Sequence, residues 1–201
     1  MISARDDGAT IARLAMPDTS SFPTPSASFR FCPSCGRGPA DRPDIQVFSC
    51  AACGFHYHFN PVVAAGVLVE RDDGRVLFIR RAKEPSRGLL AFPGGFVDFG
   101  ETAEGAAARE AREETGIRVE GLVLLGSWPN LYEWKGVTYP VVDLYFTARL
   151  GSGEVASARQ EVEDVVWLRP EEVDPETLAF PTTRSALARY RVGARGREAR
   201  S

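Results

Sequence analysis

A glycine-rich loop followed by a group of acidic residues is the part of this chain best suited to chemistry. The segment begins at Gly94 and Gly95 and ends in Glu110-Ala111-Arg112-Glu113-Glu114. Residues three and four apart share a helix face, so Glu110 would lie beside Glu113 and Glu114. Adjacent glycines allow the backbone to approach a ligand closely. Carboxylates beside such a loop suit Mg²⁺, which takes oxygen ligands and binds few protein groups.

A solvated acidic helix face is the competing interpretation of the same residues. Like charges at this spacing repel by only ~0.2–0.5 kcal/mol per pair in water, so many helices tolerate them. Here the preceding glycines and Glu101 favour a metal site instead. Arg109 can pair with Glu113 on its own helix, which would relieve part of the repulsion.

The spacing of these residues resembles that of a known family. The order is Gly95, five residues, Glu101, seven residues, Arg109-Glu110, a small apolar residue, any residue, Glu113-Glu114, any residue, Gly116 and Ile117. This order resembles the Nudix box at every fixed position. The resemblance implies an α+β domain, built as an α/β/α sandwich with a mixed sheet. It also implies an enzyme that hydrolyses a nucleoside diphosphate linked to another group, releases a nucleoside monophosphate and needs Mg²⁺ or Mn²⁺.

The resemblance further implies a role for each matched residue. Glu110 and Glu114 would bind the metal, and Glu113 would be a third ligand or a partner of the ligands. The Gly94 carbonyl would be a further ligand, Glu101 an orienting or catalytic carboxylate, and Arg109 the cation that orients the glutamates. Which carboxylate acts as the base stays open. For a ligand from outside the box, Glu161 is the candidate, Glu163 its rival, and an exposed charged loop the equally weighted alternative.

Two Cys-x-x-Cys-Gly turns precede this segment. They contain Cys32 and Cys35, then Cys50 and Cys53, with fourteen residues between the pairs and no other cysteine in the chain. This spacing is typical of a tetrahedral Cys₄ zinc site. A closed Cys₄ shell has no open position, so the zinc would be structural. For the nearby His56 and His58 we favour packing or surface roles over metal binding.

A zinc ribbon directly before a Nudix domain resembles the NADH pyrophosphatase branch of the family. The array Ser-Gln-Pro-Trp-Pro-Phe-Pro typical of that branch is replaced here by Ser127-Trp128-Pro129-Asn130-Leu131-Tyr132. ADP-ribose or a related diphosphate is therefore as compatible with the sequence as NADH or NAD.

Two groups of residues are candidates for contacting the substrate. Trp128 and Tyr132 belong to an aromatic-rich segment, residues 128–139, which we expect to be a loop near the box and in which rings could stack on a base. Ordinary packing is the alternative for these rings. Arg80, Arg81, Lys83 and Arg87 precede the glycine loop and could reach the diphosphate.

The remaining pattern predicts the elements that position these residues. We expect strands at 62–69, 75–80, 89–92, 119–128, 137–148 and 162–168, with a hairpin turn at Asp72-Asp73-Gly74. A helix is expected over 102–115 with Gly116 as its C-cap, a helical turn at 170–173 and a C-terminal helix over 182–192. The predicted organisation is a disordered tail (1–28), a zinc ribbon (29–58), a Nudix domain (59–192) and a basic tail (193–201).

The composition and net charge indicate the class of protein to which the chain belongs. A hydrophobic content of 44%, a charged content of 25% and a net charge of −3 are those of a soluble globular protein without a general attraction to nucleic acid. No apolar run reaches the ~20 residues of a membrane helix, and residues 1–16 lack the apolar segment of a signal peptide. We therefore expect a cytoplasmic protein that binds a small nucleotide and neither membrane nor nucleic acid. Homodimers are common in the resembling family, so a homodimer is compatible with the sequence.

A second function from a different class also fits these features. The fold could sense a nucleotide without hydrolysing it while the ribbon contacts nucleic acid or a protein. All box glutamates are present, and only Arg37 and Arg42 supply positive charge between the two cysteine pairs. Both observations favour catalysis.

Overall fold

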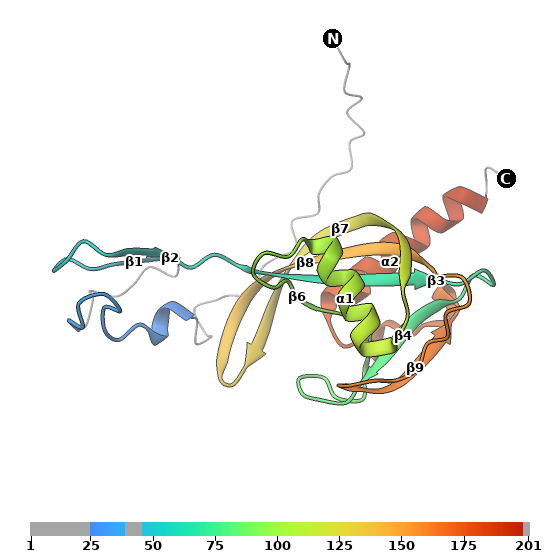
Figure 1. Ribbon diagram of the computed structural model, residues 1–201, viewed down its shortest axis with the longest axis horizontal. Helices are drawn as coiled ribbons and strands as arrows, with labels where there is room; N and C mark the ends of the chain where they lie inside the picture. The colour runs from blue at the N-terminus through green and yellow to red at the C-terminus, as the bar shows by residue number, and fades with distance from the viewer. Residues whose placement is uncertain (1–24, 39–45, 199–201) are drawn as a thin grey trace, which may run out of the picture.

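The computed structural model of the protein describes residues 25–38 and 46–198. A small two-stranded hairpin, β1 (Val47–Ser49) and β2 (His56–His58), projects from one end of a larger body (Figure 1). The body contains strands β3 (Val62–Glu70), β4 (Val76–Arg81), β5 (Leu90–Ala91), β6 (Gly94–Phe96), β7 (Val119–Trp134), β8 (Val137–Leu150) and β9 (Val162–Leu168). Its helices are α1 (Ala103–Thr115) and α2 (Pro181–Glu198), with short 3-10 helices η3 (Pro170–Glu172) and η4 (Pro175–Thr177) before α2.

The seven strands of the body form one mixed sheet between two helices. The strand order is β5-β4-β3-β8-β7, and β3 runs parallel to β8 while the other pairs are antiparallel. Ala106, Ala107 and Ala111 of α1 pack on one face of the sheet. Leu187 and Tyr190 of α2 pack on the opposite face (Figure 1). The predicted α+β sandwich with a mixed sheet is confirmed.

The sheet opens between β3 and β4, and this opening places the site. β3 pairs with β4 only near their connecting turn, at Glu70 and Val76. At the other end of β3, residues Ala64–Gly66 pair instead with the glycine strand β6. The predicted turn after β3 is present, with Gly74 in the left-handed region at φ 78°. The glycine loop is therefore held against the sheet beside the start of α1.

Helix α1 begins and ends as the sequence predicts. The Thr102 side chain caps its N-terminus by accepting a hydrogen bond of 3.1 Å from the Gly105 N–H. Gly116 ends the helix at φ 77° and donates its N–H to the Arg112 carbonyl at 2.9 Å. A left-handed C-cap favours glycine because other residues strain there.

The loop predicted for residues 128–139 is wrong. β7 continues to Trp134 and β8 begins at Val137, joined by a two-residue turn in which Lys135 and Gly136 have φ values of 50° and 75°. This hairpin contains two prolines: Pro129 lies in the edge strand β7, and Pro140 lies in β8 just before its pairing with β3 begins. Proline is tolerated where a strand has a free edge. The aromatic residues of this segment therefore occupy fixed positions in a hairpin.

Both ends of the described chain are more ordered than predicted. Pro25–Ser28, expected to be disordered, form a 3-10 helix η2 that lies against β8 and buries Ser26. Helix α2 extends to Glu198 rather than ending at Val192, since Ala194 still packs against the core. Residues 1–24 of the predicted N-terminal tail and 199–201 of the basic tail lie outside the described residues. Within the described part of the chain, no helix combines the length and the apolar character needed to cross a membrane.

Candidate active site

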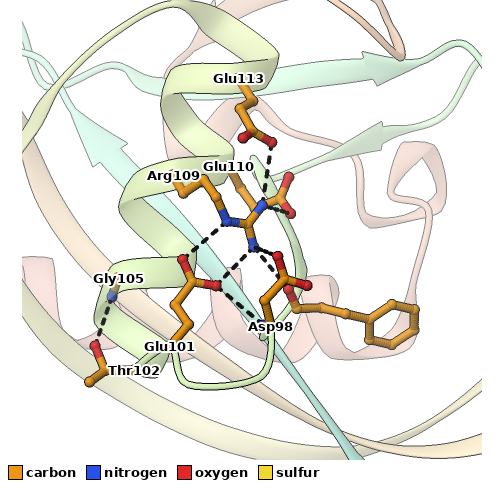
Figure 2. Close-up of polar contacts among 8 residues, drawn as sticks. Asp98, Glu101, Thr102, Gly105, Arg109, Glu110 and Glu113 are labelled. Carbon is orange, nitrogen blue, oxygen red and sulfur yellow. Dashed lines mark hydrogen bonds and ion pairs between the residues drawn. The ribbon is translucent and has the colours of Figure 1, made fainter.

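Arg109 is the centre of the polar network at the start of α1. Its Nε and Nη2 donate to the two oxygens of Glu101, each at 3.0 Å, and its Nη1 donates to Glu110 Oε1 at 2.7 Å and to Glu113 Oε2 at 3.3 Å. Its Nη2 also donates to the Phe96 carbonyl at 3.0 Å (Figure 2). The predicted orienting role of Arg109 agrees with this geometry.

Glu101 and Glu113 make different contacts with Arg109 in this network. The hydrogen bonds from Arg109 hold the pKa of Glu101 below its usual range, against the effect of burial. Glu101 is thus a fixed carboxylate that ties the loop to the helix, since it also accepts a hydrogen bond of 3.2 Å from the Asp98 N–H. Glu113 has 41% of its side chain exposed and contacts the guanidinium from the outer side.

A cavity of about 300 Å³ lies where the sheet opens between β3 and β4. Four carboxylates line it, those of Glu110, Glu114, Asp143 and Glu161, together with Arg81 and the glycine strand. Glu101 and Glu113 do not line it. The structure therefore brings Glu110, Glu114, Gly94 and Glu161 together and leaves Glu113 outside. Glu161 also pairs with Lys83, while its rival Glu163 is exposed on β9 away from the cavity.

The glycine loop contacts these carboxylates directly. The Gly94 N–H donates to Glu114 Oε2 at 3.0 Å. At Gly95 a Cβ atom would lie 2.3 Å from Glu110 Oε1. At Gly94 a Cβ atom would lie 2.7 Å from the Ala65 carbonyl oxygen and the Gly66 Cα. Both positions consequently need glycine for the helix and loop to approach so closely.

Burial and mutual repulsion disfavour the charged carboxylates when no cation is bound. Burial, helped by the Glu110 and Glu161 carboxylates, raises the pKa of Glu114 to about 8 against the opposing effects of the Gly94 N–H and Arg81. Burial likewise raises the pKa of Glu110, against the effect of Arg109. Oxygen donors that repel one another around one cavity fit a divalent cation, which would stabilise their charged forms.

Some of the residues predicted to contact the substrate line the cavity, and others do not. Tyr132 lines the cavity, whereas Trp128 does not line it and packs against the cavity residue Tyr145 with ring centroids 5.8 Å apart. Arg80 donates to the Gly88 carbonyl at 2.8 Å, and Arg87 is exposed on the loop before β5. Neither of these arginines lines the cavity. Arg81 does, because side chains alternate along β4, and its guanidinium lies 5.0 Å from the centre of the Phe180 ring.

A second polar group of the cavity was not predicted. It comprises Asn130, Asp143 and Thr183, which line the cavity, and Thr182, which donates to Asp143. No motif joins these residues, since Asp143 and Thr182 are 39 positions apart. A carboxylate in the middle of the apolar segment 137–148 was the one available signal.

The four cysteines form a group of their own. Their sulfur atoms lie within 4.8 Å of one another, with 3.7 Å between Cys32 and Cys53 and between Cys35 and Cys50. Zinc with Zn–S bonds of ~2.3 Å in tetrahedral geometry needs sulfurs ~3.8 Å apart. The backbone N–H groups of Cys53 and Ala52 lower the pKa of the Cys50 thiol to about 7, which favours the thiolate that binds metal.

The glycine of each cysteine turn has a left-handed backbone conformation. Gly36 and Gly54 both have φ 73° and donate to the Cys32 and Cys50 carbonyls at 2.9 Å. His56 and His58 are exposed, and their Nε2 atoms are 3.0 Å apart. The histidines contact each other on the surface of the hairpin and do not belong to the group of cysteines.

Comparison with known proteins identifies the family. The NUDIX domain matches residues 60–190, which include every cavity residue named above. The chain belongs to the Nudix family. The resemblance found in the sequence is confirmed.

Several Nudix proteins are similar over much of the chain. The NAD-capped RNA hydrolase NudC of Pseudomonas aeruginosa is 31% identical over 165 residues, which are 81% of this chain and 54% of that protein. A MutT-like protein of Streptomyces ambofaciens is 44% identical over 114 residues, 57% of this chain and 67% of that protein. The crystal structure of a Nudix hydrolase from Nitrosomonas europaea has a TM-score of 0.61 at 28% identity, covering 80% of this chain and 89% of that one. The chain spans about half the length of the NudC relatives.

Proposed function

We propose that the protein hydrolyses the diphosphate linkage of a nucleoside diphosphate derivative and releases a nucleoside monophosphate. The observation that carries this proposal is the convergence of Glu110, Glu114 and Glu161 on one cavity of about 300 Å³. Clefts of this size and larger bind small ligands in other proteins. ADP-ribose, NAD and NADH are the substrates to test first, because relatives are named for an NAD-capped RNA.

Glu110 and Glu114 would hold the catalytic divalent cation, with Glu161 and the Gly94 carbonyl as further ligands. Mg²⁺ or Mn²⁺ supplies charge neutralisation at the diphosphate and makes water more acidic when bound. Arg81 faces the same cavity and would bind a phosphate oxygen, since a guanidinium matches phosphate well. Glu101 and Arg109 position Glu110, because Arg109 contacts both.

Hydrolysis needs a water molecule, a base and a leaving phosphate. A water oxygen forms the new P–O bond, one bridging P–O bond breaks, and the departing phosphate keeps its electron pair. The proton of the water passes to a carboxylate. Glu101 is engaged by Arg109 through both oxygens, so the base is to be sought among the carboxylates that line the cavity.

The cysteine group would bind one structural zinc ion. With four thiolate ligands this zinc would have no open coordination position, and its ligands, Cys32 and Cys35 before β1 and Cys50 and Cys53 between β1 and β2, lie outside the cavity lining. Its role is to hold a segment whose core contains only a few buried residues, among them Phe48.

A substrate panel tests the proposed reaction. ADP-ribose, NAD, NADH, diadenosine polyphosphates and nucleoside triphosphates are incubated with Mg²⁺, with Mn²⁺ and with EDTA, and nucleoside monophosphate is measured by chromatography. We expect cation-dependent release from at least one diphosphate of the first three. Tight nucleotide binding without turnover of any substrate would instead favour the non-catalytic sensor.

A further inference from the structure

The cavity that the glutamates line also contains a buried carboxylate on β8. Asp143 is 8% exposed in the middle of β8, paired with Ala64 of β3 on one side and Trp128 of β7 on the other. It therefore has strands on both sides and faces the first turn of α2. Burial raises its pKa, while hydrogen bonds from Thr182 and Asn130 lower it.

Both of these hydrogen bonds end on the same oxygen of Asp143. Thr182 Oγ1 donates to Oδ2 at 2.6 Å and Asn130 Nδ2 donates to Oδ2 at 2.8 Å. The orientation of the Asn130 amide is fixed from the other side, since its Oδ1 accepts the Leu131 N–H at 2.9 Å. Asp143 is thus held rigidly by two donors that serve no other acceptor at comparable distance.

The second oxygen of Asp143 is available to a ligand. Among the described residues no hydrogen bond ends on Asp143 Oδ1, and the single buried side-chain atom without a partner is Arg184 Nε. Oδ1 is therefore not sealed inside the protein. Since Asp143 lines the cavity, Oδ1 offers a fixed hydrogen-bond acceptor there.

Aromatic rings line the same cavity as Asp143. Tyr132 lies between Phe96 and Phe180, with ring centroids 5.6 Å and 6.2 Å away, and all three line the cavity. Phe96 is 44% exposed, so part of its ring is open to a ligand. Stacking of a flat ring on an aromatic side chain is worth ~1–3 kcal/mol per base. A planar group is the ligand that these walls fit.

We propose that Asp143 determines substrate specificity by accepting, on Oδ1, a hydrogen bond from an –NH₂ group carried by a planar aromatic ring of the substrate. This inference rests on the proposed hydrolysis of a nucleoside diphosphate derivative at the glutamates of the same cavity. Two parts of such substrates share this chemistry: an amino-bearing base such as adenine, and the carboxamide of a nicotinamide ring. The experiment below distinguishes them.

Matched substrates that differ only at the –NH₂ group test the assignment. For the base, ADP-ribose is compared with its analogue that carries unsubstituted purine. For the nicotinamide ring, NAD is compared with its 3-acetylpyridine analogue, in which a methyl ketone replaces the carboxamide. In wild-type protein, we expect kcat/KM to fall about 10- to 100-fold for the analogue of whichever ring binds beside Asp143, as for loss of a hydrogen bond to a charged group. The other pair should differ little.

The Asp143→Asn variant provides a sharper test. Because Asn130 and Thr182 both donate to the Oδ2 position, the new amide should place its oxygen there and its –NH₂ toward the cavity. The variant should then prefer a ring that offers an acceptor: IDP-ribose, with the oxygen of hypoxanthine, or the 3-acetylpyridine analogue. A merely structural role for Asp143 would not reverse a preference. Thr147→Ala, on the same strand but outside the cavity, is the matched control and should keep the wild-type ratios.

Two results would count against the proposal in different ways. Equal kcat/KM within about twofold for both pairs in wild-type protein would overturn the role of Asp143 and leave the hydrolysis intact. If no substrate is turned over at all, the proposed reaction fails, and calorimetric binding of AMP and of purine riboside monophosphate still tests Asp143. Equal affinities in that measurement, together with equal affinities for nicotinamide mononucleotide and its 3-acetylpyridine analogue, would overturn the assignment.

Discussion

At the scale of single residues, two of the four glutamates of the box line the cavity and two do not. Glu110 and Glu114 line the cavity, whereas Glu101 is bound by Arg109 and Glu113 is half-exposed. The box pattern contains all four glutamates but does not show which of them line the cavity. That depends on which way α1 faces and on the position of β6, and both follow from the tertiary structure.

Replacing Glu114 by Gln should abolish most turnover without unfolding the protein. The substitution keeps the shape of the side chain but removes a charge that the cation needs. We expect kcat/KM to fall at least ~100-fold, as is common when a group that stabilises charge in a reaction is removed, and Tm to stay within a few degrees. Glu104→Gln, on the exposed face of the same helix, is the matched control and should retain near-wild-type rates.

The raised pKa of Glu114 should also make stability depend on pH when no cation is present. Its pKa is about 8 in the folded protein against a usual value of 4.5, so the folded state binds the proton more tightly than the unfolded state. This contribution to stability is fully present below about pH 4.5 and is lost as the pH rises to about 8.

Thermal unfolding in EDTA between pH 5 and pH 8 measures this effect. Wild-type Tm should fall with rising pH relative to Glu114→Gln, which cannot titrate at this position. Mg²⁺ should restore the wild-type Tm most strongly near pH 8, because it binds the charged form. Parallel pH profiles for the two proteins in EDTA would show that Glu114 has an ordinary pKa.

At the scale of elements, the close contact between β6 and α1 fixes the position of Glu110 in the cavity. Gly95→Ala would place a Cβ atom 2.3 Å from Glu110 Oε1, so the glutamate must move. We expect a large loss of kcat with a smaller loss of stability. Gly193→Ala in α2, where a Cβ atom meets nothing within 4 Å, should leave the rate unchanged. Equal activity of Gly95→Ala and wild type would mean that the position of Glu110 is not critical.

Short sequence patterns correctly predicted the elements that depend on residues close together in the sequence. Helix α1 and its two caps are encoded by Thr102 and Gly116, and the β3–β4 turn by Gly74. The segment 128–139 was wrongly predicted as a loop, because its pairing as part of the β7–β8 hairpin depends on which strands are neighbours. Arg81, rather than Arg80, faces the cavity for a similar reason: alternation fixes the two faces of β4, but the register with β5 and β9 decides which face is the site. Asp143 could not be found from a motif, since its partners lie on β7 and α2.

At the scale of the whole molecule, the cysteine group and the cavity are separate features of the chain. Cys32 and Cys50 pack with Phe48 in a cluster that contains neither α1 nor the cavity residues. Loss of zinc should therefore disturb the β1–β2 hairpin first and the hydrolytic site only indirectly.

Cys32→Ser should lower bound zinc from about one ion per chain to near zero, measured by metal analysis of the purified protein. It should also lower the thermal stability of the hairpin, because a structural zinc supplies much of the folding energy of so small a segment. Ser34→Ala, an exposed change within the same turn, should keep the metal. Full zinc occupancy in Cys32→Ser would contradict the Cys₄ site.

The most direct measurement of the central claim is the binding of Mn²⁺ to this cavity, followed by electron paramagnetic resonance. Wild-type protein should remove free Mn²⁺ from solution with a saturable signal, Glu104→Gln should do the same, and Glu110→Gln and Glu114→Gln should each bind at least about tenfold more weakly. Undiminished Mn²⁺ binding by both cavity variants would contradict the proposal that Glu110 and Glu114 hold the catalytic cation.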